Sequence, residues 1–357
     1  IHFYGVVQMS RKQVVIMMDC ARLVDIQNLL NYFGVFCHFG EGEIIIVRKY
    51  IPKFAKEFEM LGHEKNAQVK FILDIQRDTR ECVDYVDKIP AVGNLIADIG
   101  KRLNLSGNSR VYGRWKESES IGRNTLKKYL NDFHGAMGRV DDSELKSKVE
   151  LVEQAVNSDV IWDEIVSIDY YDADELEYVY DFTVPNAESF MVDNGIMVHN
   201  TLNSVSWDTE IMLKVDDELV RTKIGAWIDG RIERAEEQNI EKHPHDTTLE
   251  YVRDKKVYVP ACTEDGMIIW DEVEATTRHP VVNKDGTNTV LKITTESGRV
   301  VVATKAKSFL KRVNNKIIGV DGDTLKVGDY LPVSNSIVFE DYDDKWLYRK
   351  LDYTIPC

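Results

Sequence analysis

The tripeptide Trp-Asp-Glu occurs twice in this 357-residue chain, at 162–164 and at 270–272. In both places an aliphatic strand-like stretch follows, then an acidic or glycine-containing turn, then alternating β-forming residues. The segments 162–184 and 270–304 are either a duplicated β unit or two strand-turn-strand stretches that are similar by chance. Duplication predicts a mainly β fold with pseudo-two-fold symmetry, because two copies can bury their apolar faces against each other. Residues 321–333, which continue the second copy, predict a turn followed by an edge strand.

The chain before residue 150 has a different pattern, in which helices and strands alternate. Residues 13–18 favour a strand or the start of a buried helix, and 42–49 favour a strand. Residues 23–34 and 51–62 each predict a helix that ends at a glycine. These elements predict a small α/β unit. Two further amphipathic helices are expected within 91–107 and 121–133.

Composition excludes several classes of protein. The hydrophobic fraction of 43% is ordinary for a folded globular chain, and no apolar run approaches the 18 residues of a membrane helix. The N-terminal residues lack the pattern of a secretion signal, so a cytoplasmic protein without a membrane partner is expected. The five cysteines are scattered and form no Cys-x-x-Cys pair, which predicts neither a disulfide framework nor a metal site. No cofactor is expected.

Positive charge gathers in one segment of an otherwise acidic chain. The formal net charge is −15, but eight Lys and Arg residues lie between Gly100 and Leu130 against two acidic residues. Tyr112 and Trp115 are interleaved with them, which is typical of a surface that contacts phosphate, and residues 91–131 are therefore a candidate site for duplex DNA. The alternative is a solvated helix face with core aromatics. The candidate DNA-contacting residues are Arg110, Arg114, Lys116, Arg123, Lys127 and Lys128.

The sequence His199-Asn200-Thr201 has the residue types needed for self-cleavage of the chain. An asparagine can attack its own main-chain carbonyl with its side-chain amide, which forms a succinimide and releases the next residue. A neighbouring imidazole can protonate the departing nitrogen. Ser204 follows shortly after, and a serine can move its own acyl group from nitrogen to oxygen, from where a threonine hydroxyl can take it. The tripeptide alone is weak evidence, and its context gives it weight.

That context resembles an intein, a self-splicing element with the HINT (Hedgehog/intein) fold, over about 180 residues. The stretch VYDFTVPNAESFMVDNGIMVHN at 179–200 is similar to the C-terminal splicing block, and SVSWDTEIML at 204–213 is similar to the block that begins an intein. GRVVVATKAKSFL at 298–310 is similar to the block that usually carries Thr-x-x-His. The resemblance implies a role for each of seven residues. They are Ser204 as first nucleophile, Thr201 as the residue after the intein, Asn200 as the cyclising residue, His199 as its assistant, Asp181 as the residue that couples the steps, and Thr304 and Lys307 around the first scissile peptide.

Two positions depart from the family pattern. Lys307 stands where the Thr-x-x-His block usually has histidine, and Glu188 stands where the C-terminal block often has histidine. A lysine ammonium can still donate to the scissile amide if burial lowers its pKa. The first step at Ser204 is therefore expected on chemical grounds.

The order of the blocks is unusual, because the end of the intein at Asn200 precedes its beginning at Ser204. A permuted chain, or two pieces of a split intein that are fused, explains this order. The biological order would then be 204–357 followed by 1–200, with flanking extein segments as partners. The resulting divisions are 1–63 (partial endonuclease-like lobe), 64–150 (helical, basic), 151–200 and 204–334 (the two halves of the HINT domain), 201–203 (extein-like bridge) and 335–357 (acidic linker).

Residues 1–63 resemble the second half of a lobe of a LAGLIDADG homing endonuclease, an α/β unit. The helix that ends in the metal-binding aspartate of that family is missing, so DNA cleavage is not expected. The AKSFL form of the block at 298–310 resembles inteins that interrupt family-B DNA polymerases. Other possibilities are a Hedgehog-type autoprocessing domain and a DNA-binding protein or endonuclease remnant with a non-splicing β domain.

Overall fold

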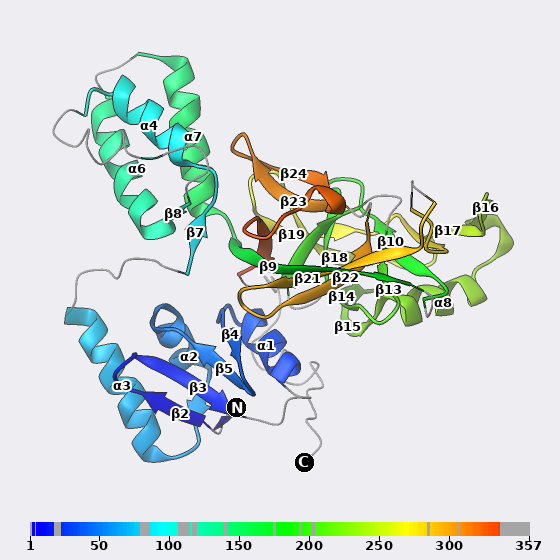
Figure 1. Cartoon of the computed structure of the whole chain (residues 1–357), viewed down its shortest axis with the longest axis horizontal. Coiled ribbons are helices and arrows are strands. Elements are labelled where there is room, and N and C mark those ends of the chain that lie inside the picture. The colour runs from blue at the N-terminus through cyan, green and yellow to red at the C-terminus, as the bar shows by residue number, and fades with distance from the viewer. Residues whose placement is uncertain are drawn as a thin grey trace.

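The computed structural model describes most of the chain. The described residues are 2–3, 5–17, 23–78, 86–105, 115, 120–138, 141–173, 176–192, 195–200, 204–283, 286–305 and 308–335. Figure 1 shows three parts: an α/β part at the lower left, a helical group at the upper left and a large β part on the right.

The α/β part is built around a four-stranded sheet in the order β2-β3-β5-β4. Buried and more exposed positions alternate along β2 and β5, whereas three consecutive residues of β3 are buried. A short parallel pair, β1 with β6, lies beside this sheet. The elements are β1 (His2–Phe3), β2 (Gly5–Gln8), β3 (Gln13–Met17), α1 (Leu23–Tyr32), β4 (His38–Gly40), β5 (Glu43–Ile46), η2 (Arg48–Tyr50), α2 (Ile51–Glu57), β6 (Glu59–Met60) and α3 (His63–Asp78). The strand expected within 13–18 is confirmed, and the helix expected over 51–62 ends earlier, because the chain turns into β6.

In the residues that the structure describes, the helical group has three helices and a two-stranded ribbon. These are β7 (Lys88–Ile89), α4 (Gly93–Arg102), β8 (Ile121–Gly122), α6 (Arg123–Met137) and α7 (Ser143–Asn157). Both helices expected from the amphipathic pattern are confirmed as α4 and α6. The side chain of Asp142 accepts a hydrogen bond from the amide of Leu145 and so caps the start of α7.

The β part contains a 13-stranded sheet and a four-stranded sheet. The order in the larger sheet is β16-β17-β20-β10-β13-β22-β21-β9-β25-β12-β23-β24, with β11 paired to β12, and the smaller sheet has the order β15-β14-β18-β19. The first strands are β9 (Val160–Asp172), β10 (Val179–Thr183), β11 (Ser189–Val192) and β12 (Ile196–His199). Next come β13 (Val205–Ser206), β14 (Glu210–Val215), β15 (Glu218–Lys223), α8 (Ile224–Arg234), η4 (Glu237–Asn239), β16 (Ile240–His243), β17 (Thr247–Tyr251), β18 (Val257–Cys262), β19 (Ile268–Glu272) and β20 (Ala275–His279). The last are β21 (Thr289–Thr295), β22 (Val300–Thr304), β23 (Ser308–Val313), β24 (Lys316–Asp321), η5 (Gly322–Thr324) and β25 (Tyr330–Ser334).

Strands from before and after residues 201–203 interleave in the large sheet. β10 lies between β20 and β13, and β9 lies between β21 and β25. Because each of these strands has partners from the other segment, neither segment can complete the sheet alone. The two segments therefore form one β unit.

The two Trp-Asp-Glu segments have the same local pairing pattern, although β9 lies inside the large sheet and β19 at the end of the small one. Trp162 on β9 is paired with Pro332 on β25, and Trp270 on β19 is paired with Pro260 on β18. The neighbouring pairs match as well, because a tyrosine stands opposite the glutamate in both. This identical register supports duplication. The expectation that β25 is an edge strand was wrong, because β25 is bonded to β9 on one side and to β12 on the other.

A continuous core joins the α/β part to the β part. Phe36 and Leu30 of the α/β part belong to the same buried cluster as Ile196 and Ile293 of the β part. A polar contact is embedded in it: the fully buried Arg299 donates to Asn31 Oδ1 over 3.2 Å and lies 4.4 Å from the centre of the Phe36 ring. The α/β part and the β part therefore share one hydrophobic core. Within the described residues, no helix combines the length and apolar character that a membrane crossing requires.

Candidate functional site

Ser204 is buried and immediately precedes β13, a strand in the middle of the large sheet. Its side chain has no exposed surface. Its amide donates to Thr304 Oγ1 over 3.2 Å, and the amide of Thr304 donates to the Ser204 carbonyl over 3.0 Å. Strand β13 brings them together, because Val205 pairs with Ala303 on β22. Two residues that the sequence predicted for the same step, 100 positions apart, are therefore in direct contact.

His279 is the residue of this site that the sequence analysis missed. Its Nε2 lies 2.8 Å from Ser204 Oγ, and its Nδ1 lies 2.8 Å from the carbonyl oxygen of Pro280. A sequence signal did exist, since residues 276–279 read Thr-Thr-Arg-His and so have the Thr-x-x-His spacing. The resemblance had placed that block at Thr304 instead.

Strand register explains why these residues share one face of the sheet. Val179 on β10 is opposite His279 on β20 and also opposite Ser206 on β13. Paired residues project to the same side, and so do residues two apart on one strand. The Asp181 position, opposite Thr277, therefore lies on the same face as His279. Asp181 is buried, and its Oδ1 accepts a hydrogen bond from the Phe182 amide.

The opposite face of the same strands carries a carboxylate clamp. Asp229 on α8 accepts hydrogen bonds from three side chains, each on or next to a strand of the site. They are Tyr180 on β10 (3.0 Å), Trp207 after β13 (3.0 Å) and Arg278 on β20 (3.0 Å). Burial and the bond to Asp229 raise the pKa of Tyr180. The clamp ties α8 to all three strands.

Asn200 is held by the turn that precedes β11. Its amide donates to the Glu188 carbonyl over 2.9 Å, and its side-chain Nδ2 donates to the Val184 carbonyl over 3.0 Å. The turn is itself held by the buried Asp271, which accepts from Asn186 Nδ2 and from the Ala187 amide, each over 2.8 Å. Gly195 supplies the sharp turn between β11 and β12 with φ of 93°.

Among the described residues, Glu188 and Gly319 lie next to the His199 ring. Its Nε2 lies 3.5 Å from the Glu188 carboxylate, and the ring lies next to Gly319 on β24. A methyl group at position 319 would lie 2.9 Å from the ring atoms Cγ and Cδ2. Glu188, which replaces a residue that is often histidine in the family, is thus a neighbour of the assisting imidazole.

Several predicted site residues lie outside the described residues. They are Thr201, Lys307, Arg110, Arg114 and Lys116. No structural statement about their roles follows.

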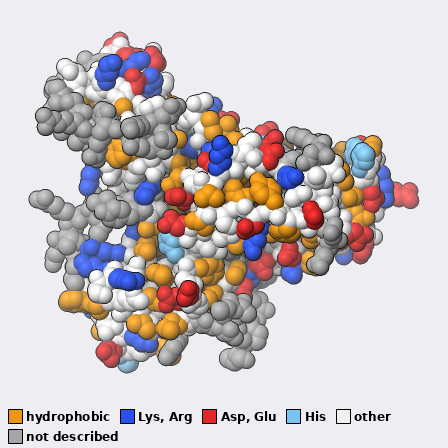
Figure 2. Space-filling view, in the orientation of Figure 1, with side chains coloured by type: hydrophobic (Ala, Val, Ile, Leu, Met, Phe, Trp, Pro, Cys, Tyr) orange, Lys and Arg blue, Asp and Glu red, His pale blue; other side chains and the backbone are white. Residues whose placement is uncertain are grey.

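The assignment of Arg123 to DNA contact was wrong, because its guanidinium is buried and fully engaged within the protein. It bonds to Asp87 over 2.8 Å and to main-chain carbonyls at the end of α7. Lys127 and Lys128 are exposed on α6. Arg102 is paired with Glu144 over 2.9 Å, and Figure 2 shows acidic and basic side chains side by side on the helical group. Positive charge in the described part of this group is therefore partly neutralised.

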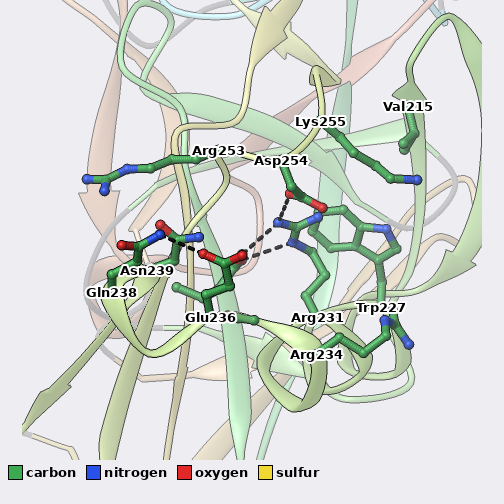
Figure 3. A pocket seen from close by; sticks show the side chains of 12 residues that line it. Val215, Trp227, Arg231, Arg234, Glu236, Gln238, Asn239, Arg253, Asp254 and Lys255 are labelled. Carbon is green, nitrogen blue, oxygen red and sulfur yellow. Dashed lines mark hydrogen bonds and ion pairs between the residues drawn. The ribbon is translucent and has the colours of Figure 1, made fainter.

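A separate pocket of about 640 Å³ lies between α8, η4 and the end of β17 (Figure 3). Arg231 in its wall bonds to Glu250 and Asp254, each over 2.6 Å, and packs on Trp227. Of the residues predicted for splicing, none that the structure describes lines it. Among the described residues, no group of three His, Cys, Asp or Glu side chains could hold a metal ion.

The sequence of this chain is similar to parts of several known proteins. The chain is 28% identical over 213 residues to the DNA-directed RNA polymerase subunit Rpo1C of Methanocaldococcus jannaschii, covering 56% of this chain and 24% of that protein. It is 44% identical over 75 residues to the replicative DNA helicase DnaB of a Nostoc species, covering 21% of this chain and 8% of that protein. The chain thus spans a quarter or less of these relatives.

Solved structures give a weaker comparison. The transcription factor IIB Mvu mini-intein covers 36% of this chain and 78% of its own, with 22% identity and a TM-score of 0.31. The Mja mini-intein of the same factor covers 36% and 64%, with 27% identity and a TM-score of 0.27. These TM-scores are too low to establish a common fold. The family model of the intein splicing domain, however, matches residues 12–200, more than half of the chain, and its match ends at Asn200. The chain therefore belongs to the intein splicing domain family.

Proposed function

We propose that this chain catalyses the bond rearrangements of protein splicing on itself, at the peptide bonds before Ser204 and after Asn200. The observation that carries the proposal is the buried contact between Ser204 and Thr304 in a sheet that also carries Asn200 at the end of β12. Asn200 and Ser204 are four residues apart, so their Cα atoms lie within about 15 Å. The two peptide bonds that react therefore lie close together in the structure.

The upstream reaction is an acyl shift at Ser204. Its Oγ forms a bond to the carbonyl carbon of the preceding residue, the bond from that carbon to the Ser204 nitrogen breaks, and the nitrogen gains the proton that the hydroxyl loses. Thr304 Oγ1 already accepts a hydrogen bond from this nitrogen. It is therefore placed to stabilise the positive charge that develops as the nitrogen is protonated.

The downstream reaction is cyclisation of Asn200. Its Nδ2 forms a bond to its own carbonyl carbon, the bond to the nitrogen of Thr201 breaks, and that nitrogen gains a proton. His199 is the proton donor in this proposal, and Glu188, 3.5 Å from its Nε2, stabilises the protonated imidazole. Nδ2 must first leave the Val184 carbonyl, so the observed arrangement is a resting state.

Full ligation is not proposed for this chain. Transfer of the acyl group from Ser204 to Thr201 would close a ring of three residues, which trans peptide bonds oppose. Complete splicing requires the order 204–357 followed by 1–200, with flanking segments on both sides. The interleaving of both segments in one sheet supports that permuted or split order.

Mass spectrometry of the purified chain tests the proposal. Incubation should give fragments that end at Asn200, and hydroxylamine, which attacks esters, should add fragments that end at residue 203. Ser204→Ala should remove only the second set and Asn200→Ala only the first. Self-processing would be contradicted if the unsubstituted chain stayed intact both in buffer and in hydroxylamine, and if the two variants did the same.

The same comparison separates the competing functions. A Hedgehog-type autoprocessing domain would cleave before Ser204 but not after Asn200, and a non-splicing β domain would cleave at neither junction. The host protein is proposed to act in replication or transcription, because that is what the names of the curated relatives describe. A DNA polymerase is one member of this wider class.

DNA binding by the helical group is a further proposal, now based on Lys127 and Lys128 and not on Arg123. Its support is their exposure on α6 and the basic character of the sequence around them. Binding of a duplex should weaken steeply as salt rises, and the double substitution of both lysines by alanine should weaken it further. If duplex binding changed neither with salt nor with this substitution, the two lysines would be part of a solvent-exposed helix face that has no role in DNA binding. The α/β part is proposed to be a remnant of an endonuclease lobe without cleavage activity.

A further inference from the structure

The hydrogen bonds of His279 determine which of its nitrogens carries the proton. The Pro280 carbonyl can only accept a hydrogen bond, and it lies 2.8 Å from Nδ1. In the neutral ring, Nδ1 is therefore the protonated nitrogen and Nε2 carries a lone pair. That lone pair is 2.8 Å from Ser204 Oγ, so the serine hydroxyl donates its proton towards His279.

The surroundings make this contact suited to proton transfer. Ser204 has no exposed surface and His279 is only 8% exposed, so bulk water has little access to the hydroxyl. The strand register fixes both residues on one face, and the Asp229 clamp holds the neighbouring residues Arg278 and Tyr180 from the other face. A base that is held at hydrogen-bond distance from a nucleophile contributes about 10²-fold to 10⁴-fold to the rate.

We propose that His279 is the general base for the acyl shift at Ser204, and this rests on the function proposed above. The imidazole Nε2 takes the proton from Oγ while Oγ forms its bond to the carbonyl carbon of the preceding residue. As the bond from that carbon to the Ser204 nitrogen breaks, the imidazolium returns the proton to this nitrogen. Proton and charge then balance, and no further reactant is needed.

The proposed base lies on β20, whereas the position at which the family usually has histidine is 307 in this sequence. Position 307 holds lysine in this chain, and a protonated lysine cannot accept a proton. His279 reaches the nucleophile from β20, two strands away from β13 with β10 between them. In this proposal His279 accepts the proton of the Ser204 hydroxyl, and Thr304 stabilises the Ser204 nitrogen through its hydrogen bond.

A double-mutant cycle in the full chain tests the assignment, with hydroxylamine-dependent cleavage before residue 204 as the measured rate. His279→Gln keeps an amide near the Nε2 position but removes the basic nitrogen. It should slow this cleavage by about 10²-fold or more. A thiol is far more acidic than a hydroxyl, so the Ser204→Cys background needs less help from a base, and there His279→Gln should slow cleavage by less than about tenfold.

Two controls separate chemistry from folding. His243→Gln changes a histidine at the surface of β16 and should leave the rate unchanged. Cleavage after Asn200, measured in the same sample, reports whether the His279→Gln chain still folds. Retention of that cleavage with loss of the upstream one supports the proposal.

Other outcomes overturn it. Equal losses in the Ser204 and Ser204→Cys backgrounds would show that His279 only supports the structure, as would loss of both cleavages. An unchanged upstream rate in His279→Gln would show that another group accepts the proton. Absence of hydroxylamine cleavage in the unsubstituted chain would instead contradict the proposed function itself, so the two failures are distinguishable.

Discussion

The side-chain nitrogen of Asn200 donates a hydrogen bond to the carbonyl oxygen of Val184 over 3.0 Å. This nitrogen is the atom that attacks in the proposed cyclisation. The bond holds it on the turn before β11, and the turn is held in its place by Asp271. Control of the downstream reaction therefore extends to residues far from it in the sequence.

Asn200→Ala should abolish cleavage after residue 200, because alanine has no nucleophile that can form a succinimide. The measurement is the intact mass of the purified chain during incubation. Asn157→Ala, an exposed asparagine at the end of α7, is the matched control and should cleave like the unsubstituted chain. Continued cleavage of Asn200→Ala would mean that another residue breaks this bond.

Gly319→Ala should slow the downstream cleavage by about tenfold, a fraction of what a general acid contributes. The added methyl group would lie 2.9 Å from the His199 ring, so the ring has to move. Gly135→Ala adds a methyl group that meets nothing within 4 Å and should have no effect on the rate. Equal rates in the Gly319→Ala and Gly135→Ala chains would show that the ring position is unimportant.

Asp271→Asn should slow cleavage after Asn200 and spare the acyl shift at Ser204. The Asp271 carboxylate accepts from three donors, Asn186 Nδ2 and the amides of Ala187 and Glu272, and an asparagine would direct its own NH₂ group at some of them. An unsatisfied donor at this site costs about 1–3 kcal/mol. Fragment yields at the two junctions measure the effect, with the exposed Asp265→Asn as control. A matched loss at both junctions would argue against a local role.

Arg299→Met should destabilise the whole chain. The guanidinium is fully buried, donates to Asn31 and Ser297, and lies 3.8 Å from the Asp163 carboxylate, which would be left buried without it. Removing one partner of such a group costs about 3–5 kcal/mol. Thermal unfolding should show the loss, whereas the exposed Arg253→Met should unfold like the unsubstituted chain.

Labelling of Cys37 gives a second measure of the same contact. Burial raises the pKa of the Cys37 thiol to about 12, although Arg299 lowers it, so the thiol is protonated and unreactive near neutral pH. A thiol reagent should label Cys37 faster in the Arg299→Met chain because the packing around it loosens. Unchanged labelling and unchanged unfolding together would contradict the role of Arg299 as a link between the parts.

The sequence by itself determined the residues whose chemistry depends on neighbours along the chain. The neighbouring residues His199 and Asn200 indicate cyclisation chemistry before any fold is known. The blocks around Ser204 and Thr304 can likewise be identified from short continuous stretches of sequence. The helices α4 and α6 followed from apolar spacing, and the repeated Trp-Asp-Glu indicated duplication that the register of β9 and β19 supports. Each of these depends on local order or on periodicity.

The tertiary structure alone decided which distant residues meet. His279 reaches Ser204 because β10 pairs with both β20 and β13 in one register, and a shift by one residue would turn His279 to the other face. Arg123 looked like a surface cation in a basic segment, but the fold closes α7 over it and its charge is satisfied by Asp87. Burial and strand register are set by contacts between residues tens to hundreds of positions apart, and for that reason no pattern within a single stretch could predict them.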